Sequence, residues 1–138
     1  MPQPSFLSAS LLVVLGGGLG SWLRFLVGRG WTAALGPVRA GAFPYGTLTV
    51  NVLGGLAMGV LAGWLARSGS HGEGTRLLLA VGVLGGFTTF SSFGLDTVTL
   101  IERGETATAA FYVTVSLVAS VGALFLGLSA ARGLGAAA

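Results

Sequence analysis

Four long stretches of this sequence contain no charged residue, and this feature constrains the fold more than any other. They run from Met1 to Leu23, from Ala40 to Ala66, from Leu77 to Leu95 and from Thr106 to Ala131. Each is close to or longer than the ~20 residues that a helix needs to cross the ~30 Å hydrocarbon core of a bilayer. Only 8% of the 138 residues are charged, against about 25% in soluble domains. The sequence therefore predicts an all-α integral membrane protein in which residues 1–138 form a single four-helix transmembrane domain.

The predicted spans are separated by segments that hold the charges and the turn residues. We place the four spans near residues 5–28, 45–66, 76–100 and 107–131. A cleavable signal peptide is an alternative for the first span. It is not favoured, because no basic residue precedes the apolar run and the run exceeds the usual 7–15 residues. The connection from Arg29 to Pro44 has a structure that the sequence does not predict.

The arginines do not fix the orientation of the chain. Four spans would place both termini on one side of the membrane. That side would carry Arg67, Arg76 and Arg132, and the other would carry Arg24, Arg29, Arg39 and Arg103. Basic residues normally gather on the cytoplasmic side. Three arginines on one side and four on the other are too nearly equal to indicate the orientation. Two alternatives stay open: the rule is weak here, or copies insert in both orientations and pair antiparallel.

Several classes of function are disfavoured by composition. The chain has no cysteine and a single histidine, so thiolate metal sites and disulfides are excluded. Its basic residues are all arginine and are scattered singly, which argues against a nucleic-acid partner. No histidine–carboxylate pair falls within a span, so we do not expect an enzyme.

Glycines recur at the spacing that lets membrane helices approach closely. The sets are Gly16 and Gly20, then Gly55, Gly59 and Gly63, then Gly82 and Gly86. Small residues four apart allow backbone contact where lipid supplies no hydrophobic drive. The ridges could serve packing inside one chain or an oligomer face, and both alternatives stay open.

Polar residues inside the spans are the candidates for function, since burying them in lipid is costly. Asn51 lies in the middle of the second span. It could form an interhelical hydrogen bond, or it could be an amide donor that lines a pathway.

The third span contains the densest polar signal, Gly85-Gly86-Phe87-Thr88-Thr89-Phe90-Ser91-Ser92-Phe93. Two glycines and four hydroxyl residues disfavour an uninterrupted helix. A break inside a membrane is tolerated only where protein or a watery cavity surrounds it, and free carbonyls at such a break can bind a cation. Phenylalanines at every third position share one face beyond the break. An aromatic stripe is often core packing, but hydroxyl residues interleaved with it favour a functional role.

The fourth span carries a polar residue at every fourth position. These residues are Thr108, Tyr112, Ser116 and Ser120. Any one serine could bond the carbonyl four residues back, but four in register suggest a track of hydroxyls. Amides, hydroxyls and aromatic ring edges are all electropositive at their rims, so they suit an anion. Arg24, at the end of the first span, could attract anions or simply anchor the helix at the interface.

These motifs identify a resemblance along essentially the whole chain. It resembles the Fluc (CrcB) fluoride channels in three elements: the glycine run Gly16–Gly20 followed by Arg24, the segment Gly46–Gly54 with Asn51, and the Gly85–Phe93 motif. The third element is specific, and the first alone would be weak. The resemblance implies an antiparallel dual-topology homodimer in the inner (plasma) membrane, with a broken third helix and two parallel fluoride pores.

The resemblance also implies roles for individual residues. A structural Na⁺ would lie at the dimer centre on the main-chain carbonyls of Gly85 and Thr88. Two departures are small: Ser92 replaces a threonine, and Asp96 stands where the family usually has glutamate. The implied pore residues are Asn51, Thr89, Phe90, Phe93, Tyr112, Ser116 and Ser120, with Arg24 matching the family's first-span arginine.

We therefore expect a passive, selective fluoride channel that lets cytoplasmic fluoride leave down its gradient and so reduces its toxicity. One rival is a proton-coupled exporter of the small multidrug-resistance type. It would need a carboxylate in the membrane, typically in the first span, and residues 5–28 contain none. Another rival, a packing subunit without transport, would not need polar stripes in three of its spans.

Overall fold

The computed structural model describes residues 4–67 and 73–136, and all regular secondary structure within these ranges is helical. Four helical segments are long and apolar enough to cross a membrane: Phe6–Ala42, Tyr45–Ala66, Glu73–Glu102 and Thr106–Gly133. The prediction of an all-α protein with four such helices is confirmed. The elements are α1 (Phe6–Ala42), α2 (Tyr45–Arg67), α3 (Glu73–Thr75), the π-helix η1 (Arg76–Leu84), α4 (Gly85–Phe87), α5 (Phe90–Glu102) and α6 (Thr106–Ala136).

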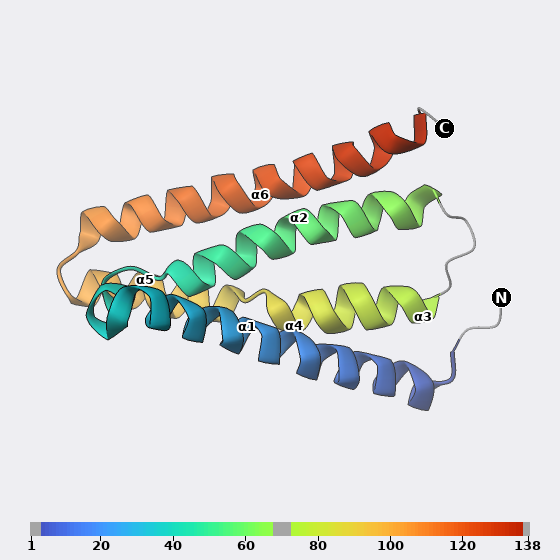
Figure 1. The fold of residues 1–138 in the computed structure, drawn as a ribbon, viewed down its shortest axis with the longest axis horizontal. Coiled ribbons are helices and arrows are strands. Elements are labelled where there is room, and N and C mark those ends of the chain that lie inside the picture. The colour runs from blue at the N-terminus through green and yellow to red at the C-terminus, as the bar shows by residue number, and fades with distance from the viewer. Residues whose placement is uncertain (1–3, 68–72, 137–138) are drawn as a thin grey trace.

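The four helical segments run alternately up and down, so α1 begins at the same end of the bundle at which α6 finishes (Figure 1). Elements α3, η1, α4 and α5 follow one another as a single interrupted rod. In Figure 1 this rod lies beside α1, and α2 lies beside α6. The bundle thus consists of two close helix pairs, and the functional candidates lie where the pairs meet.

Helix α1 extends beyond the span expected near residues 5–28. It is capped by Ser5, whose side chain accepts from the Ser8 amide at 3.3 Å, and it stays helical through Gly28 and Gly30. The helical course breaks at Gly36, where φ is +77°, and Pro37 follows. A positive φ is readily adopted only by glycine, and proline cannot donate a helical hydrogen bond. The connection from Arg29 to Pro44 is therefore mostly helix with one sharp bend.

The glycine ridges bring helices together within one chain. A Cβ atom at Gly82 would lie 2.9 Å from Gly16 Cα, so α1 and η1 touch backbone to backbone. A Cβ at Gly55 would lie 2.6 Å from the Ser120 carbonyl oxygen, which joins α2 to α6 in the same way. Of the two alternatives for these ridges, packing inside the chain is the one observed here.

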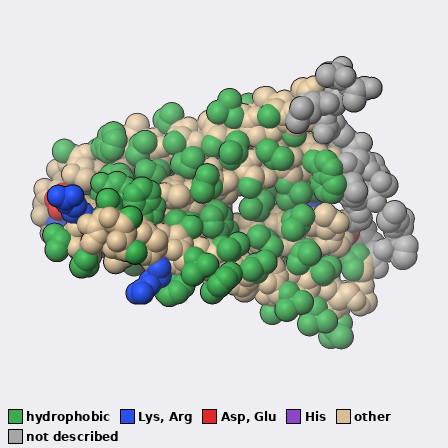
Figure 2. Space-filling view, viewed as in Figure 1, with side chains coloured by type: hydrophobic (Ala, Val, Ile, Leu, Met, Phe, Trp, Pro, Cys, Tyr) green, Lys and Arg blue, Asp and Glu red, His purple; other side chains and the backbone are tan. Residues whose placement is uncertain are grey.

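Large apolar side chains cover the outside of the bundle. Phe6, Phe25, Val118 and Phe125 are all more than half exposed. On the face drawn in Figure 2, green hydrophobic side chains spread over the whole described surface, and most of the visible basic side chains lie toward the end where α5 meets α6. Such a surface is suited to lipid or to another membrane protein rather than to water.

Candidate functional site

The rod that contains α3 to α5 is interrupted at two threonines. Helix α4 ends at Phe87; Thr88 (φ −81°, ψ 160°) and Thr89 (φ −155°, ψ 118°) are extended; α5 then begins at Phe90. The Thr89 hydroxyl caps α5 by accepting from the Ser92 amide at 3.1 Å. An interruption of this kind removes backbone hydrogen bonds that a continuous helix would make, so other groups must replace them.

Asn51 of α2 replaces two of those bonds. Its Nδ2 donates to the Thr89 carbonyl oxygen at 3.1 Å, and its Oδ1 accepts from the Thr89 amide at 2.8 Å. The interhelical hydrogen bond weighed for Asn51 is therefore present, as a pair. A carboxamide carries two N–H donors, so this pairing engages one of them.

Arg24 of α1 forms a hydrogen bond with the carbonyl of the neighbouring residue, Thr88. Its Nη1 donates to the Thr88 carbonyl oxygen at 3.1 Å. The guanidinium therefore lies at the interruption itself. Its charge sits beside one of the two carbonyls that the resemblance assigns to Na⁺.

The Gly85 carbonyl loses the donor that a continuous helix would give it. In a continuous helix it would accept from the Thr89 amide, which here donates to Asn51 instead. Gly85 is exposed, and a Cβ built on it would have only the Ala80 oxygen nearby, at 3.7 Å. A carbonyl oxygen released in this way is the hard donor that Na⁺ takes at broken membrane helices.

A groove of about 340 Å³ opens on one side of the interruption. Phe90 projects at its rim with 81% of its surface exposed, and its ring centroid lies 5.5 Å from that of Phe93. Six of the expected pore residues line this groove, together with Thr88 and apolar residues of α2 and α6: Asn51, Thr89, Phe90, Phe93, Ser116 and Ser120.

Two hydroxyls in the groove make no hydrogen bond of good geometry among the described residues, although that of Ser116 lies near the Tyr112 hydroxyl. The Oγ atoms of Ser116 and Ser120 are buried, and neither forms a hydrogen bond within residues 4–67 and 73–136. Thr114, on the same helix, bonds the carbonyl of Ala110 four residues back at 2.9 Å. The explanation in which each serine satisfies itself on its own helix therefore does not apply to Ser116 and Ser120. A buried, unpaired hydroxyl costs free energy unless a ligand or water completes it.

Tyr112 lies behind the groove and is not part of its lining. Its side chain is fully buried, and its hydroxyl donates to Asp96 Oδ2 at 3.3 Å. The ring packs against Phe93 at 5.4 Å and edge-on against Phe43 at 5.6 Å. In this structure Tyr112 supports Phe93 and orients Asp96.

A second cavity, of about 470 Å³, lies on the other side of the interruption. We call it the vestibule; its polar lining includes Arg24, Thr47, Ser92 and Asp96. Thr89 lines both the vestibule and the groove, so the interruption separates the two spaces. Sequence reasoning did not select Thr47. Its position four residues before Asn51 places both on one face of α2, and that spacing could have revealed it.

The arrangement offers donors rather than reactive groups. The groove contributes hydroxyls, an amide and ring edges, and the vestibule contributes a guanidinium. Among the residues that the structure describes, no three histidine, cysteine or acidic side chains gather as a metal site would require. Such hydroxyl and amide donors can hold a small anion without fixing it in place.

Comparison with known proteins agrees with this picture. Residues 11–128 match the family model described as "CrcB-like protein, Camphor Resistance (CrcB)". A protein of Novosphingobium aromaticivorans is 56% identical over 128 residues, which cover 93% of this chain and 99% of that protein. Proteins of Nitrobacter winogradskyi and Rhodospirillum centenum are 51% and 52% identical over 122 residues, covering 88% of this chain and 94% of each relative. All three relatives are named fluoride-specific ion channel FluC.

Proposed function

The chain belongs to the CrcB family, and from this premise we propose that it is a fluoride-selective channel through which cytoplasmic fluoride leaves passively. The resemblance read from the sequence motifs is thereby confirmed. The protein is a multi-pass membrane protein and a transporter rather than an enzyme. Export down the electrochemical gradient would lower the toxicity of fluoride.

The observation that carries this proposal is the pair of buried hydroxyls beside the interruption. The Oγ atoms of Ser116 and Ser120 are buried without a hydrogen bond among the described residues, and both residues line the groove together with Thr89. We propose that fluoride passes from the vestibule, past Thr89, and along these hydroxyls. Asn51 would add its remaining N–H donor there, and Arg24 would raise the anion concentration in the vestibule.

Selectivity would follow from the size of the ion and the type of donor. The groove has no fixed cationic side chain in its lining, so an anion that enters can also leave, as conduction requires. The positive edges of Phe90 and Phe93 would complete the shell of hydroxyl and amide donors. Fluoride, the smallest halide, gains most from short contacts with such donors.

We further propose that two copies form an antiparallel, dual-topology homodimer with a broken third membrane helix in each copy. The groove is open to one side, and Phe90 at its rim is largely exposed. A second copy would close the groove and give Phe90 a partner surface. The balanced arginines at the two ends are compatible with insertion in both orientations.

We also propose a structural Na⁺ at the centre of that dimer. The carbonyls of Gly85 and Thr88 would hold it, two from each copy. Gly85 fits, because the donor that would bond its oxygen in a continuous helix pairs with Asn51. Thr88 fits because its carbonyl oxygen has two lone pairs. One accepts the hydrogen bond from Arg24, and the other could bind the ion. When bound, the ion would neutralise carbonyl dipoles that face one another across the dimer.

Efflux from liposomes tests the channel function. Vesicles loaded with potassium fluoride and containing the purified protein should release fluoride to an ion-selective electrode once a K⁺ ionophore balances charge, with no proton gradient. Chloride-loaded vesicles should release little under the same conditions. Release that required a proton gradient would favour an exporter, and chloride release of similar size would contradict selectivity.

A further inference from the structure

The segment Gly36–Phe43 covers part of the vestibule, and we call it the cap. It starts at the bend at Gly36, where φ is +77°. It ends at Phe43, whose ring packs 4.9 Å from Tyr45 and 5.6 Å from Tyr112. Between these points Arg103, the residue after α5, donates from Nη1 to the Gly41 carbonyl oxygen at 2.9 Å. The cap is therefore pinned to the end of α5 by an arginine.

A third cavity, of about 150 Å³, lies under the cap. Its lining includes Arg103, Thr99 and Phe43. Ala40, Pro44 and Asp96 line both this cavity and the vestibule. The two spaces therefore meet beside Asp96, and each has its own arginine: Arg24 in the vestibule and Arg103 in the third cavity.

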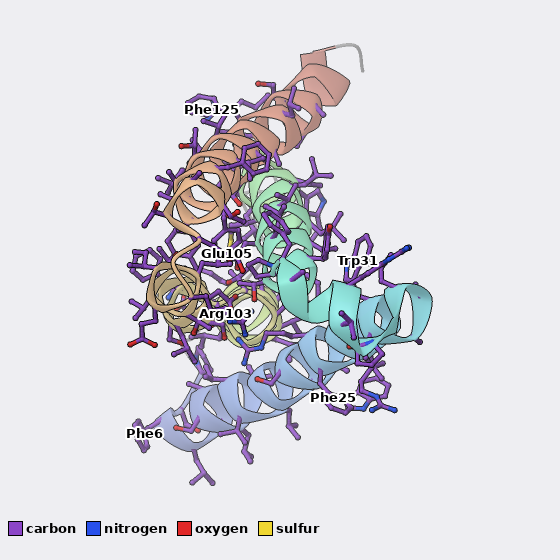
Figure 3. The ribbon with its side chains drawn as sticks, turned by 90° about the vertical axis from the view of Figure 1, so that its left-hand side faces the viewer. Phe6, Phe25, Trp31, Arg103, Glu105 and Phe125 are labelled. Atoms are coloured by element: carbon purple, nitrogen blue, oxygen red, sulfur yellow. The ribbon has the colours of Figure 1, made fainter. Side chains whose placement is uncertain are left out.

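The position of Arg103 suits an encounter with anions. It is exposed at the turn from α5 into α6, where Figure 3 labels it with Glu105, and Trp31 of α1 lies across the same end of the bundle. The bond to Gly41 engages one of the five N–H donors of a guanidinium, whose charge persists at any physiological pH. Glu102 and Glu105 are exposed and line neither cavity. Among residues 4–67 and 73–136, Asp96 is the only acidic residue in either lining.

We propose that the cavity under the cap is a second access mouth for small anions, and that Arg103 is the residue that concentrates them there. This inference rests on the proposed fluoride conduction. A cationic side chain at the neck of a low-dielectric cleft raises the local anion concentration and speeds association. Fluoride would thus reach Asp96 and Thr89 from both sides of the cap, by way of Arg24 or of Arg103.

A single engineered cysteine tests the charge at this mouth directly, because the chain has none of its own. Arg103→Cys protein would be purified, reconstituted and modified with a cationic, an anionic or a neutral thiosulfonate reagent of similar size. Fluoride efflux would be measured at low fluoride, where access limits the rate, and at about 0.1 M ionic strength, where charges act over about 10 Å. We expect efflux about threefold faster with the cationic than with the anionic adduct, and an intermediate rate with the neutral one.

Glu105→Cys is the matched control, since Glu105 is exposed two residues away and lines neither cavity. Fluoride efflux with the cationic and anionic adducts of Glu105→Cys should differ by less than half of the difference found for Arg103→Cys. Equal charge effects at both positions would show a general surface potential and overturn the inference. Equal efflux for all three Arg103→Cys adducts would also overturn it, while the channel function stood. If the protein without an engineered cysteine released no fluoride, the proposed function and this inference would both be overturned.

Discussion

Asn51 shows how a structural side chain can bear on the proposed fluoride path. It bonds both the amide and the carbonyl of Thr89, so it stabilises the extended backbone that α4 and α5 leave between them. The same backbone sets the position of the Thr89 side chain, which lines both the groove and the vestibule. Loss of the amide should therefore disturb the pathway even if fluoride never touches Asn51.

Asn51→Ala should reduce fluoride efflux by roughly tenfold or more, because each unpaired backbone group of Thr89 costs about 1–3 kcal/mol and about 1.4 kcal/mol on a barrier is tenfold in rate. Asn51→Asp keeps the acceptor for the Thr89 amide and loses the donor. It should fold better than the alanine variant and still conduct poorly. Wild-type efflux with Asn51→Ala, in protein of unchanged oligomeric state, would contradict the role given to this residue.

Ser116→Ala and Ser120→Ala should lower fluoride efflux without lowering stability. Neither hydroxyl forms a hydrogen bond among the described residues, so its removal abolishes a desolvation cost of about 1–3 kcal/mol and breaks no bond. Thermal melting in detergent and electrode efflux would be compared for each variant. Thr114→Ala is the control, because that hydroxyl bonds its own helix and lies outside the groove. A destabilised serine variant with normal efflux would exclude the serines from the pathway.

The sequence predicted which residues lie near one another better than it predicted their hydrogen bonds. The spacing of Ser116 and Ser120 put them on one face of α6, and both line the groove. Tyr112 shares that spacing, yet it is buried against Asp96, because the packing of Phe43 and Phe93 around its ring depends on residues far away in the sequence. The partners of Asn51 and Arg24 on Thr89 and Thr88 likewise could not be read from spacing, since they depend on how α1 and α2 flank the rod.

At the scale of the elements, glycine determines how closely the helices approach. Charge-free length was enough to predict four helices, because an apolar stretch of about 20 residues is the length of a membrane helix and about twice that of a barrel strand. It could not show that α1 continues past Gly30 to Ala42, since glycine and proline signal a bend without giving its position. Nor could spacing alone tell internal packing of the ridges from an oligomer face, because both need the same small residues.

Gly86→Ala should destabilise the protein by about 1–3 kcal/mol through overpacking. A Cβ at Gly86 would meet the carbonyl oxygen of Gly17 and would lie 3.0 Å from its Cα, both rigid backbone atoms of α1. Gly18→Ala is the matched control: nothing lies within 4 Å of a Cβ there, and the gain in helix propensity is about 1 kcal/mol. Equal melting temperatures for the two variants would contradict the close contact between α1 and α4.

At the scale of the whole molecule, we propose that the pathway needs a second copy of the chain. Its groove is open along one side, and the exposed ring of Phe90 stands at the rim. The proposed antiparallel homodimer would close it with a second copy of the same surface, and two tests address this assembly.

Dual topology predicts that a reporter at one end appears on both sides of the membrane. In the Glu105→Cys variant, about half of the chains in intact cells should react with an impermeant thiol reagent. The other half should react only after the membrane is permeabilised. Val118→Cys, 69% exposed on α6 near the centre of the span, should stay unmodified by a charged reagent in either case. Complete labelling from one side alone would contradict the antiparallel dimer.

The proposed Na⁺ predicts a cation-dependent dimer. Replacing Na⁺ by a large organic cation at equal ionic strength should lower the melting temperature of the purified dimer. A ligand present at 100 times its dissociation constant stabilises by about 2.7 kcal/mol. The dimer should also dissociate more readily on gel filtration. Identical melting temperatures in the two salts would contradict the proposal that the dimer binds Na⁺.

The hydrogen bonds that stabilise the interruption at Thr88 and Thr89 also have a consequence for biosynthesis. The carbonyl of Thr88 and the amide and carbonyl of Thr89 are bonded by Arg24 and Asn51, and both residues precede Thr88 in the chain. The ribosome therefore delivers these two side chains before the segment that needs them, so these three backbone groups need not face acyl chains unpaired. A circularly permuted gene that translated the third span first would lose this order, and its product should depend far more on chaperones and insertion factors to reach the native bundle.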